Sequence, residues 1–234
     1  MALYIRGLNK AYGNLNIFEN FNLHIKENKI TCILGPSGCG KTTLLNIISG
    51  TLKDYKGELI GFDKKEFSYI FQETRLLEWM TIWKNIEFVL KRIYSKKTRE
   101  EIIEKYLNMV NLYQFKSYYP RQLSGGMKQR VSIARAFAYP SDILLMDEPF
   151  IGIDLKLKSN LIENFINLWN KDLRTVIFVT HNIDEAFLLG DEIYILGGYP
   201  TKVENKITIK EDKIKRNLQK DNIINLKKEI LDKT

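Results

Sequence analysis

Residues 35–43, GPSGCGKTT, match the spacing G-x-x-x-x-G-K-[ST] of a phosphate-binding loop. The match follows the apolar run ITCILG and opens a segment of helical character, which is the context that such a loop requires. Its glycines would let backbone N–H groups converge on phosphates, and the amino end of the helix would add positive charge. Lys41 would bring a charge to the phosphates, and the Thr42 hydroxyl would ligate Mg²⁺. The alternative is a structural glycine turn.

Two carboxylates follow a second apolar run, ILLMDE. Asp147 and Glu148 would lie where a buried strand ends, at the carboxyl edge of the sheet and beside the phosphate loop. We expect Asp147 to hold Mg²⁺ through water and Glu148 to orient or deprotonate the attacking water. An acidic pair after a strand is more often a solvated turn, but the phosphate loop favours the catalytic interpretation.

Three more side chains are candidates for contact with a nucleotide. His181 follows the run VIFVT and would donate a hydrogen bond to the γ-phosphate, although its position alone does not separate this role from a structural one. The Gln72 carbonyl, after FSYIF, would reach Mg²⁺ or water. Tyr12 would stack on adenine, with a core or surface aromatic as the alternative. His24, in an alternating strand pattern, is expected to be structural.

A second anion-binding segment, LSGGM, is not needed by a site of this kind within one chain. Ser124 is a predicted helix N-cap, and Gly125 and Gly126 expose backbone N–H groups; an ordinary capped helix start is the alternative. With this segment, the chain resembles the ATP-binding cassette (ABC) ATPases over essentially its full length, and LSGGMKQR is highly specific to them. The resemblance implies that the segment binds the γ-phosphate of ATP held by the opposite subunit of a head-to-tail dimer.

The resemblance also assigns roles to the single residues. It implies ATP hydrolysis with Mg²⁺, with Glu148 as the catalytic carboxylate, His181 as the switch histidine and Lys41 in the phosphate loop. Ser124, Gly125, Gly126 and Asp154 would act on the ATP of the other subunit, and Thr42, Gln72 and Asp147 would hold the metal. The ATP-binding residues would be Tyr12, Gly35, Pro36, Ser37, Gly38, Cys39, Gly40, Lys41, Thr42, Thr43 and Gln72.

The segment FQETRLLEWMTIWKNI narrows the resemblance to importer ATPases of the nitrate/sulfonate/taurine type. It implies a membrane-spanning permease that docks near Trp79, an extracytoplasmic solute-binding protein that acts indirectly, and a peripheral place on the cytoplasmic face of the membrane. A Trp/Leu cluster is otherwise expected to be core. Glu78 replaces a proline that is usual in that group, and FIGID at 150–154 replaces the commoner FGALD.

Composition limits the alternatives. The chain has 234 residues, a net charge of +8 and two cysteines, so no disulfide framework is expected and a reducing cytoplasm is the default. Basic residues are concentrated in the last thirty-odd residues, but acids and aliphatics separate them, which favours a solvated helical face over a binding stripe; attraction to anionic lipid head groups is the alternative. We expect no nucleic-acid partner. One alternative is a soluble ABC ATPase acting on nucleic acid or ribosomes, but such proteins usually carry two cassettes or a long coiled coil. The other is a small-molecule kinase, but it would have no need of LSGGM.

Strands and helices alternate on both sides of a helical block, which predicts an α/β fold. We expect a P-loop NTPase core with a mainly parallel sheet, an antiparallel β subdomain at the N-terminus and a helical subdomain insert. In the single domain 1–234, residues 1–72 and 139–205 would form the core, 73–138 the helical subdomain and 206–234 a C-terminal strand/helix extension.

Local patterns predict finer features of these elements. GELI and FSYIF would form a short strand pair. Ile82, Ile86, Leu90 and Ile93 would share one face of a helix that begins after Thr81. Thr98 and Glu101 would form a capping box before the next helix.

Overall fold

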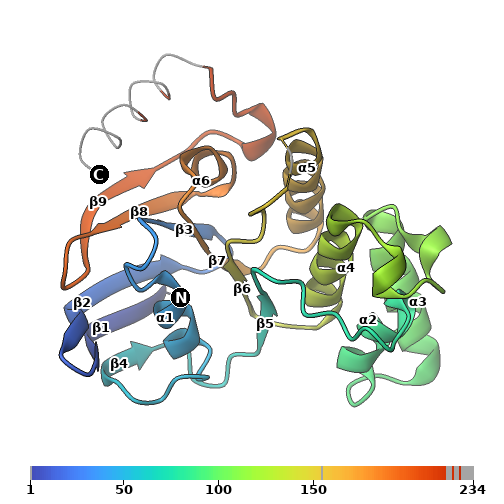
Figure 1. The fold of residues 1–234 in the computed structure, drawn as a ribbon, viewed down its shortest axis with the longest axis horizontal. Coiled ribbons are helices and arrows are strands. Elements are labelled where there is room, and N and C mark those ends of the chain that lie inside the picture. Colours follow the sequence, from blue (N-terminus) through green and yellow to red (C-terminus); the bar gives the residue numbers. More distant parts are fainter. Residues whose placement is uncertain (1, 154, 220–222, 224–226, 228–234) are drawn as a thin grey trace.

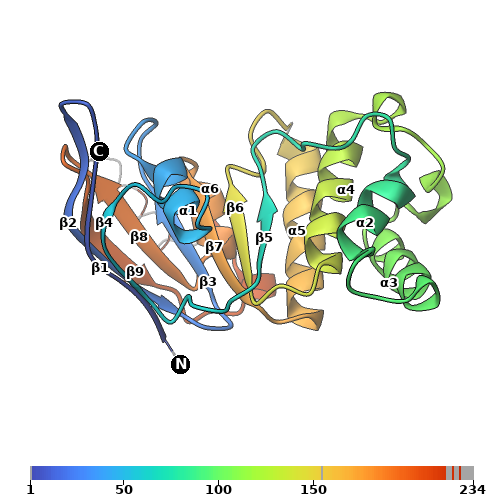
Figure 2. The ribbon, with the colours of Figure 1, turned by 90° about the horizontal axis from the view of Figure 1, so that it is seen from below.

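A smaller β-sheet, a larger β-sheet and a block of helices lie one after another across the molecule (Figures 1 and 2). The computed structural model describes residues 2–153, 155–219, 223 and 227. The smaller sheet is antiparallel, with the order β2-β1-β4; its strands are β1 (Ala2–Tyr12), β2 (Leu15–Lys26) and β4 (Lys56–Ile60). The larger sheet has the order β5-β6-β7-β3-β8-β9, and only its last pair is antiparallel. Its strands are β3 (Ile30–Leu34), β5 (Phe67–Ile70), β6 (Ile143–Asp147), β7 (Thr175–Thr180), β8 (Glu192–Gly197) and β9 (Lys202–Thr208).

Helix α1 (Lys41–Ile48) lies between the two sheets (Figure 2). It has no fully solvated face, because Leu44, Leu45, Ile47 and Ile48 are all buried. These side chains belong to one core cluster with Leu3 and Ile5 of β1 and with Ile33, Ile177 and Val179 of the large sheet. Burial of apolar surface on both sides therefore fixes the helix that follows the phosphate loop.

The opposite face of the large sheet forms a second core. Alternate residues of a strand point to opposite faces, so Cys32 and Leu34 of β3 enter this core while Ile33 enters the first. The helices on this side are α4 (Gly125–Ala138), α5 (Leu155–Lys171) and α6 (Ile183–Leu189), and the helical block adds α2 (Ile82–Leu90) and α3 (Lys96–Met109). In Figure 1 the block lies beyond α4, on the side away from the sheets.

The predicted fold class is confirmed: a mainly parallel sheet, an N-terminal antiparallel sheet and an inserted run of helices are all present. The apolar runs ITCIL, ILLMD and VIFVT lie in the strands β3, β6 and β7. The subdomain boundaries remain a prediction, and much of the segment 206–234 falls outside the described residues.

The predicted pairing of GELI with FSYIF is wrong. β4 pairs antiparallel with β1, whereas β5 pairs in parallel with β6, so the two strands belong to different sheets. Their partners come from distant parts of the sequence, which short apolar runs do not specify. Gly61, at φ +84°, turns the chain between them.

Two predictions about the helical block are also wrong. α2 ends at Leu90, and Ile93 lies in the following turn with 43% of its surface exposed. α3 begins after Ser95, whose hydroxyl accepts a hydrogen bond from the Thr98 backbone N–H at 3.4 Å. Ser95 is therefore the N-cap, and Thr98 is the third residue of the helix.

The basic tail differs from the expected solvated face at two positions. Lys213 and Arg216 are buried, at 6% and 8% exposure; Lys213 begins a short 3-10 helix, Lys213–Lys215, and Arg216 follows it. The Arg216 guanidinium donates to the carbonyls of Phe187, Leu188 and Gly190 at 2.8–3.1 Å. These carbonyls lie at the C-terminal end of α6. Gly190, which follows the helix, has extended rather than left-handed backbone, so the Arg216 side chain supplies the hydrogen bonds that a glycine turn would otherwise provide.

Candidate functional site

The phosphate loop is organised around the Lys41 ammonium group. Lys41 Nζ donates to the carbonyl oxygens of Gly35 and Pro36 at 2.8 Å each, and only 5% of the residue is exposed. Gly40 has φ +94°, and a Cβ there would lie 2.5 Å from Cγ2 of Ile17. The loop therefore requires glycine at this position both for its backbone conformation and for space.

A cavity of about 340 Å³ lies beside this loop. Most of the predicted ATP-binding residues meet there, together with the predicted catalytic residues. The lining residues are Ser37, Gly38, Gly40, Lys41, Thr42, Thr43, Gln72, Glu148, Ile151 and His181. Tyr12 and Ser124, Gly125 and Gly126 do not line it, and Asp154 lies outside the described residues.

Two of the three predicted metal-holding residues, Thr42 and Asp147, form a pair of oxygen donors, and the third, Gln72, lines the cavity. The Thr42 hydroxyl donates to Asp147 Oδ1 at 3.2 Å, and the Tyr69 hydroxyl donates to Asp147 Oδ2 at 3.5 Å. Burial raises the pKa of Asp147, and the hydrogen bond from Thr42 opposes that rise. Within the described residues no three His, Cys, Asp or Glu side chains are grouped for a metal. The donor set therefore fits Mg²⁺, which uses one or two protein oxygens together with phosphates and water.

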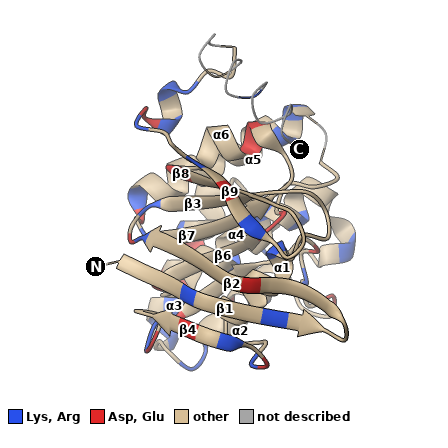
Figure 3. Ribbon diagram, turned by 90° about the vertical axis from the view of Figure 1, so that its left-hand side faces the viewer, with Lys and Arg blue, Asp and Glu red and all other residues tan. Residues whose placement is uncertain are grey.

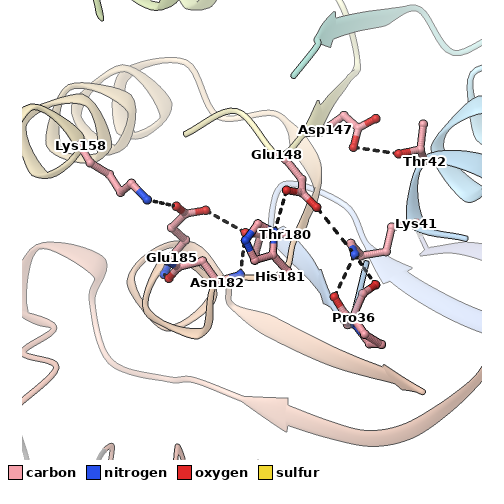
Figure 4. A network of polar contacts seen from close by, with 11 residues as sticks. Pro36, Lys41, Thr42, Asp147, Glu148, Lys158, Thr180, His181, Asn182 and Glu185 are labelled. Atoms are coloured by element: carbon pink, nitrogen blue, oxygen red, sulfur yellow. Dashed lines mark hydrogen bonds and ion pairs between the residues drawn. The ribbon is translucent and has the colours of Figure 1, made fainter. Parts of the chain in front are cut away.

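Glu148 lies between the histidine and the lysine of the site (Figure 4). Its Oε2 is 2.7 Å from His181 Nδ1, and its Oε1 is 3.7 Å from Lys41 Nζ. Its backbone has φ +43°, an uncommon value for a residue with a side chain, and its N–H donates to Val179 O at 3.0 Å. Strained backbone of this kind is concentrated at functional sites, and here it directs the carboxylate into the cavity.

A buried network that sequence reasoning missed supports His181 (Figure 4). The Thr180 hydroxyl donates to Glu185 Oε2 and accepts from the Asn182 N–H, at 2.8 and 3.0 Å. Lys158 of α5 holds the other oxygen of Glu185 at 2.8 Å. The turn that presents the histidine is therefore fixed to two helices. The polar residues of THNIDEA were the available signal.

The segment that contains Gln72 is also tied to α4, which the sequence did not indicate. The Arg135 guanidinium donates to the carbonyls of Thr74 and Arg75 at 3.0 Å each. The Gln129 side chain donates to Pro149 O at 2.6 Å, just after the two carboxylates. One helix thus contacts both chain segments that leave the cavity toward the helical block.

The start of α4 has the predicted form but no partner in the cavity. The Ser124 hydroxyl accepts a hydrogen bond from the Met127 N–H at 3.3 Å and caps the helix. A Cβ at Gly126 would overlap the Leu157 side chain, whereas nothing lies within 4 Å of a Cβ at Gly125. Gly126 is therefore required by packing inside the chain. Gly125 faces open space.

Two predicted contact residues are exposed on the surface. Tyr12 is 50% exposed, and Lys10 Nζ lies 4.6 Å from the centre of its ring. Trp79 is 73% exposed, so the default expectation that it is core is wrong. The Asn85 side chain holds the neighbouring segment by accepting from the Leu77 N–H at 2.8 Å and donating to Leu77 O and Met80 O at 3.1 Å each.

Comparisons with known proteins agree on one family. Residues 18–151 match the model of the family described as ABC transporter. The chain is 39% identical to an uncharacterized ABC transporter ATP-binding protein of Methanocaldococcus jannaschii, over 89% of this chain and 82% of that protein. It is also 39% identical to the aliphatic sulfonates import ATP-binding protein of Bacillus cereus, over 90% of this chain and 87% of that protein. A dimeric ATP-binding cassette in a post-hydrolysis state, bound to ADP and Pi, matches with a TM-score of 0.77 and 32% identity, covering 90% of this chain and 100% of that one.

Proposed function

This chain belongs to the ABC transporter family, and from that premise we propose that it hydrolyses ATP to power an importer of a small anion or organic solute, such as nitrate, a sulfonate or taurine. The observation that carries the proposal is the position of Glu148 in the phosphate-loop cavity, between His181 and Lys41. The import direction and the class of solute are supported by the name of the Bacillus relative.

The cavity residues divide the chemistry among them. Lys41 would exchange its loop carbonyls for phosphate oxygens, and Thr42, Asp147 and Gln72 would hold Mg²⁺. Bound Mg²⁺ would neutralise charge on the phosphates. Glu148 would orient or deprotonate the attacking water, and His181 would donate a hydrogen bond to the γ-phosphate. The contact between Glu148 and His181 holds the two groups side by side at the cavity, where they would act.

Completion of the site would need a second copy of the chain. Ser124, Gly125, Gly126 and Asp154 would contact ATP held by the partner, and Tyr12 would stack on adenine. The open space at Gly125 and its absence from the cavity of its own chain support this arrangement. The similar solved cassettes are dimers.

The helical block would receive the membrane-spanning permease at the surface around Trp79. Trp79 and Phe88 are 73% and 60% exposed, so both side chains could supply apolar contacts to the permease. Arg135 joins α4 to the segment that leads from Gln72 to Trp79. A movement of the cavity residues as the two subunits close on ATP would therefore reach the permease surface through Arg135. The chain would then lie on the cytoplasmic face of the membrane, and an extracytoplasmic solute-binding protein would act through the permease.

The surface gives little support to a nucleic-acid partner. On the face that carries the three-stranded sheet, basic and acidic positions are interspersed (Figure 3).

No helix in the described part of the chain is long and apolar enough to cross a membrane.

The decisive experiment measures ATPase activity of the purified chain with the permease in vesicles, with nucleic acid, and with candidate phosphate acceptors. We expect stimulation by the permease alone. Stimulation by nucleic acid, or transfer of phosphate to an acceptor, would replace the importer proposal. The permease, and the solute-binding protein encoded or purified with it, would identify the solute.

A further inference from the structure

The turn between β8 and β9, residues 198–201, contacts the phosphate loop at two consecutive carbonyls. The Tyr199 hydroxyl donates to Gly38 O at 3.1 Å, and the Thr201 hydroxyl donates to Cys39 O at 2.7 Å. Thr201 is 1% exposed, whereas Tyr199 is 61% exposed. Neither residue belongs to a motif that the proposed function uses.

Thr201 is fixed independently of the loop that it contacts. Its backbone N–H donates to Ile17 O at 2.8 Å, and an isolated bridge pairs it with Phe18 of β2. The hydroxyl is thus held where the two sheets meet. Because a hydroxyl has a single proton to donate, the bond to Cys39 O uses the whole donor capacity of the side chain.

The phosphate loop has little rigidity of its own at these peptides. Gly38 and Gly40 have φ +83° and +94°, and they flank Cys39 on both sides. Glycine adopts many backbone conformations at similar energy, so the peptides between these glycines can rotate unless an outside group holds them. Burial of Cys39 fixes its side chain but does not by itself choose the direction of its carbonyl.

The direction of that carbonyl decides where an N–H points. In a trans peptide the C=O and the next N–H point in opposite directions. With Cys39 O directed at Thr201, the Gly40 N–H faces away from the turn, and Gly40 lines the phosphate cavity. No described residue accepts a hydrogen bond from that N–H. A phosphate oxygen is the acceptor that such a group binds best.

We propose that Thr201 is a positioning residue for phosphate binding: its hydroxyl fixes the Cys39–Gly40 peptide so that the Gly40 N–H faces the nucleotide phosphates. Tyr199 acts in the same way on the preceding peptide, with a smaller effect because its bond is longer and exposed to water. The inference rests on the proposed ATP-binding function and deepens it. Neither side chain touches the nucleotide; both act through the loop.

The test compares Thr201→Val, which keeps the shape and removes the donor, with Thr201→Ser, which keeps the donor. Thr208→Val is the matched control, since Thr208 is an exposed threonine of the same hairpin. Dissociation constants for MgATP and MgADP are measured by calorimetry. We expect Thr201→Val to weaken both by about 5- to 10-fold, as loss of one hydrogen bond implies, with Thr201→Ser and Thr208→Val close to wild type.

A second measurement separates positioning from general stability. The amide proton signal of Gly40 should shift on addition of MgADP in the wild type and in Thr201→Ser, and the shift should be lost or much reduced in Thr201→Val. A variant that merely loses stability would melt at a lower temperature without nucleotide but would keep the Gly40 shift. Should Thr201→Val not fold, Tyr199→Phe tests the same inference on an exposed residue, with an expected 2- to 3-fold loss of affinity.

The outcomes distinguish this inference from the proposed function. If the wild type fails to bind MgATP, or binds it as well after Lys41→Ala, the proposed function fails. If the wild type binds MgATP through Lys41 and Thr201→Val binds it equally well with an unchanged Gly40 shift, only the positioning role is overturned. Wild-type affinity in a Tyr199→Phe variant would remove Tyr199 from the role.

Discussion

The two glycine-containing loops of this chain, residues 35–43 and 124–126, are organised to very different extents. At the first, a buried lysine, a strained glutamate and a histidine contact the loop or one another. At the second, a serine caps a helix, one glycine is required by packing, and the other faces open space. A site whose groups all come from one chain can be assembled during folding. A loop that serves a second chain must stay exposed.

The largest expected effect concerns the preorganised loop. Lys41→Ala should abolish productive ATP binding, because it removes the charge directed at the phosphates and leaves the carbonyls of Gly35 and Pro36 without their donor. Calorimetric titration with MgATP measures the loss, and the exposed Lys53→Ala serves as control. If Lys41→Ala bound and hydrolysed ATP at wild-type levels, residues 35–43 would not be a preorganised phosphate site, and the contrast with residues 124–126 would be wrong.

Glu148→Gln should lower turnover by roughly 10²-fold or more while nucleotide affinity is kept, which is the scale of general acid–base effects. The variant should accumulate as an ATP-bound dimer, visible by light scattering. Glu73→Gln, at an exposed position, should behave as wild type. Near-normal turnover in Glu148→Gln would exclude its catalytic role, whatever its contact with His181.

The two glycines of the second loop offer the sharpest comparison. Gly125→Asp should leave the melting temperature nearly unchanged but block ATP-dependent dimerisation, since a carboxylate would repel the partner's phosphate. Gly126→Ala should destabilise the fold by up to about 2 kcal/mol, because the added methyl group forces the Leu157 side chain to move, although alanine favours the helix by about 1 kcal/mol. Scanning calorimetry and scattering measure the two effects. Equal losses of stability would mean that both glycines serve packing alone.

Mixed dimers test whether the second loop acts across the interface. A tagged chain carrying Lys41→Ala is mixed with an untagged wild-type chain and with ATP that is photoreactive at the γ-phosphate. Label should appear on the tagged chain, near Gly125, and Gly125→Asp added to that chain should remove it. Label found only on the untagged chain, with mixed dimers present, would assign the loop to its own subunit.

Trp79→Asp should reduce co-purification with the permease and leave MgATP affinity near normal, because the side chain is 73% exposed and does not line the cavity. Phe67→Asp, at a half-buried strand position, would by contrast be expected to unfold the chain, and circular dichroism separates the two cases. Undiminished assembly in Trp79→Asp would place the permease surface elsewhere.

The smallest effect concerns the metal-holding carboxylate. Burial raises the pKa of Asp147 above its usual value of 3.8, so the folded state favours the protonated carboxyl. The stability that comes from this preference is present at acid pH and is lost as the pH rises through the folded-state pKa. Asp147→Asn should therefore melt slightly above the wild type at neutral pH without nucleotide, and the difference should vanish below about pH 4. A wild type that is the more stable of the two at neutral pH would contradict this.

The sequence predicted a glycine loop between a strand and a helix at residues 35–43 because that information is local. The glycine spacing, Lys41 and the apolar run before them lie within a few residues, and the alternation of strands and helices predicted the fold class. It did not predict Tyr69 beside Asp147, Arg135 on the carbonyls of Thr74 and Arg75, or Thr201 on Cys39, because these contacts join segments 60 to more than 160 residues apart. Likewise, the sequence did not show whether Ser95 or Thr98 caps the helix, because both residue types are good N-caps. In the structure Ser95 is the cap.

The burial of α1 between two sheets has a consequence for how the protein opens. The apolar side chains of α1 are buried from two sides, so its later amide hydrogens should exchange only when a larger unit unfolds and should be among the slowest of the chain. Any partial opening that detaches the N-terminal sheet would also release the phosphate loop. Nucleotide would then bind only the closed form, and ATP should protect β1 and β2 from proteases although neither strand lines the cavity.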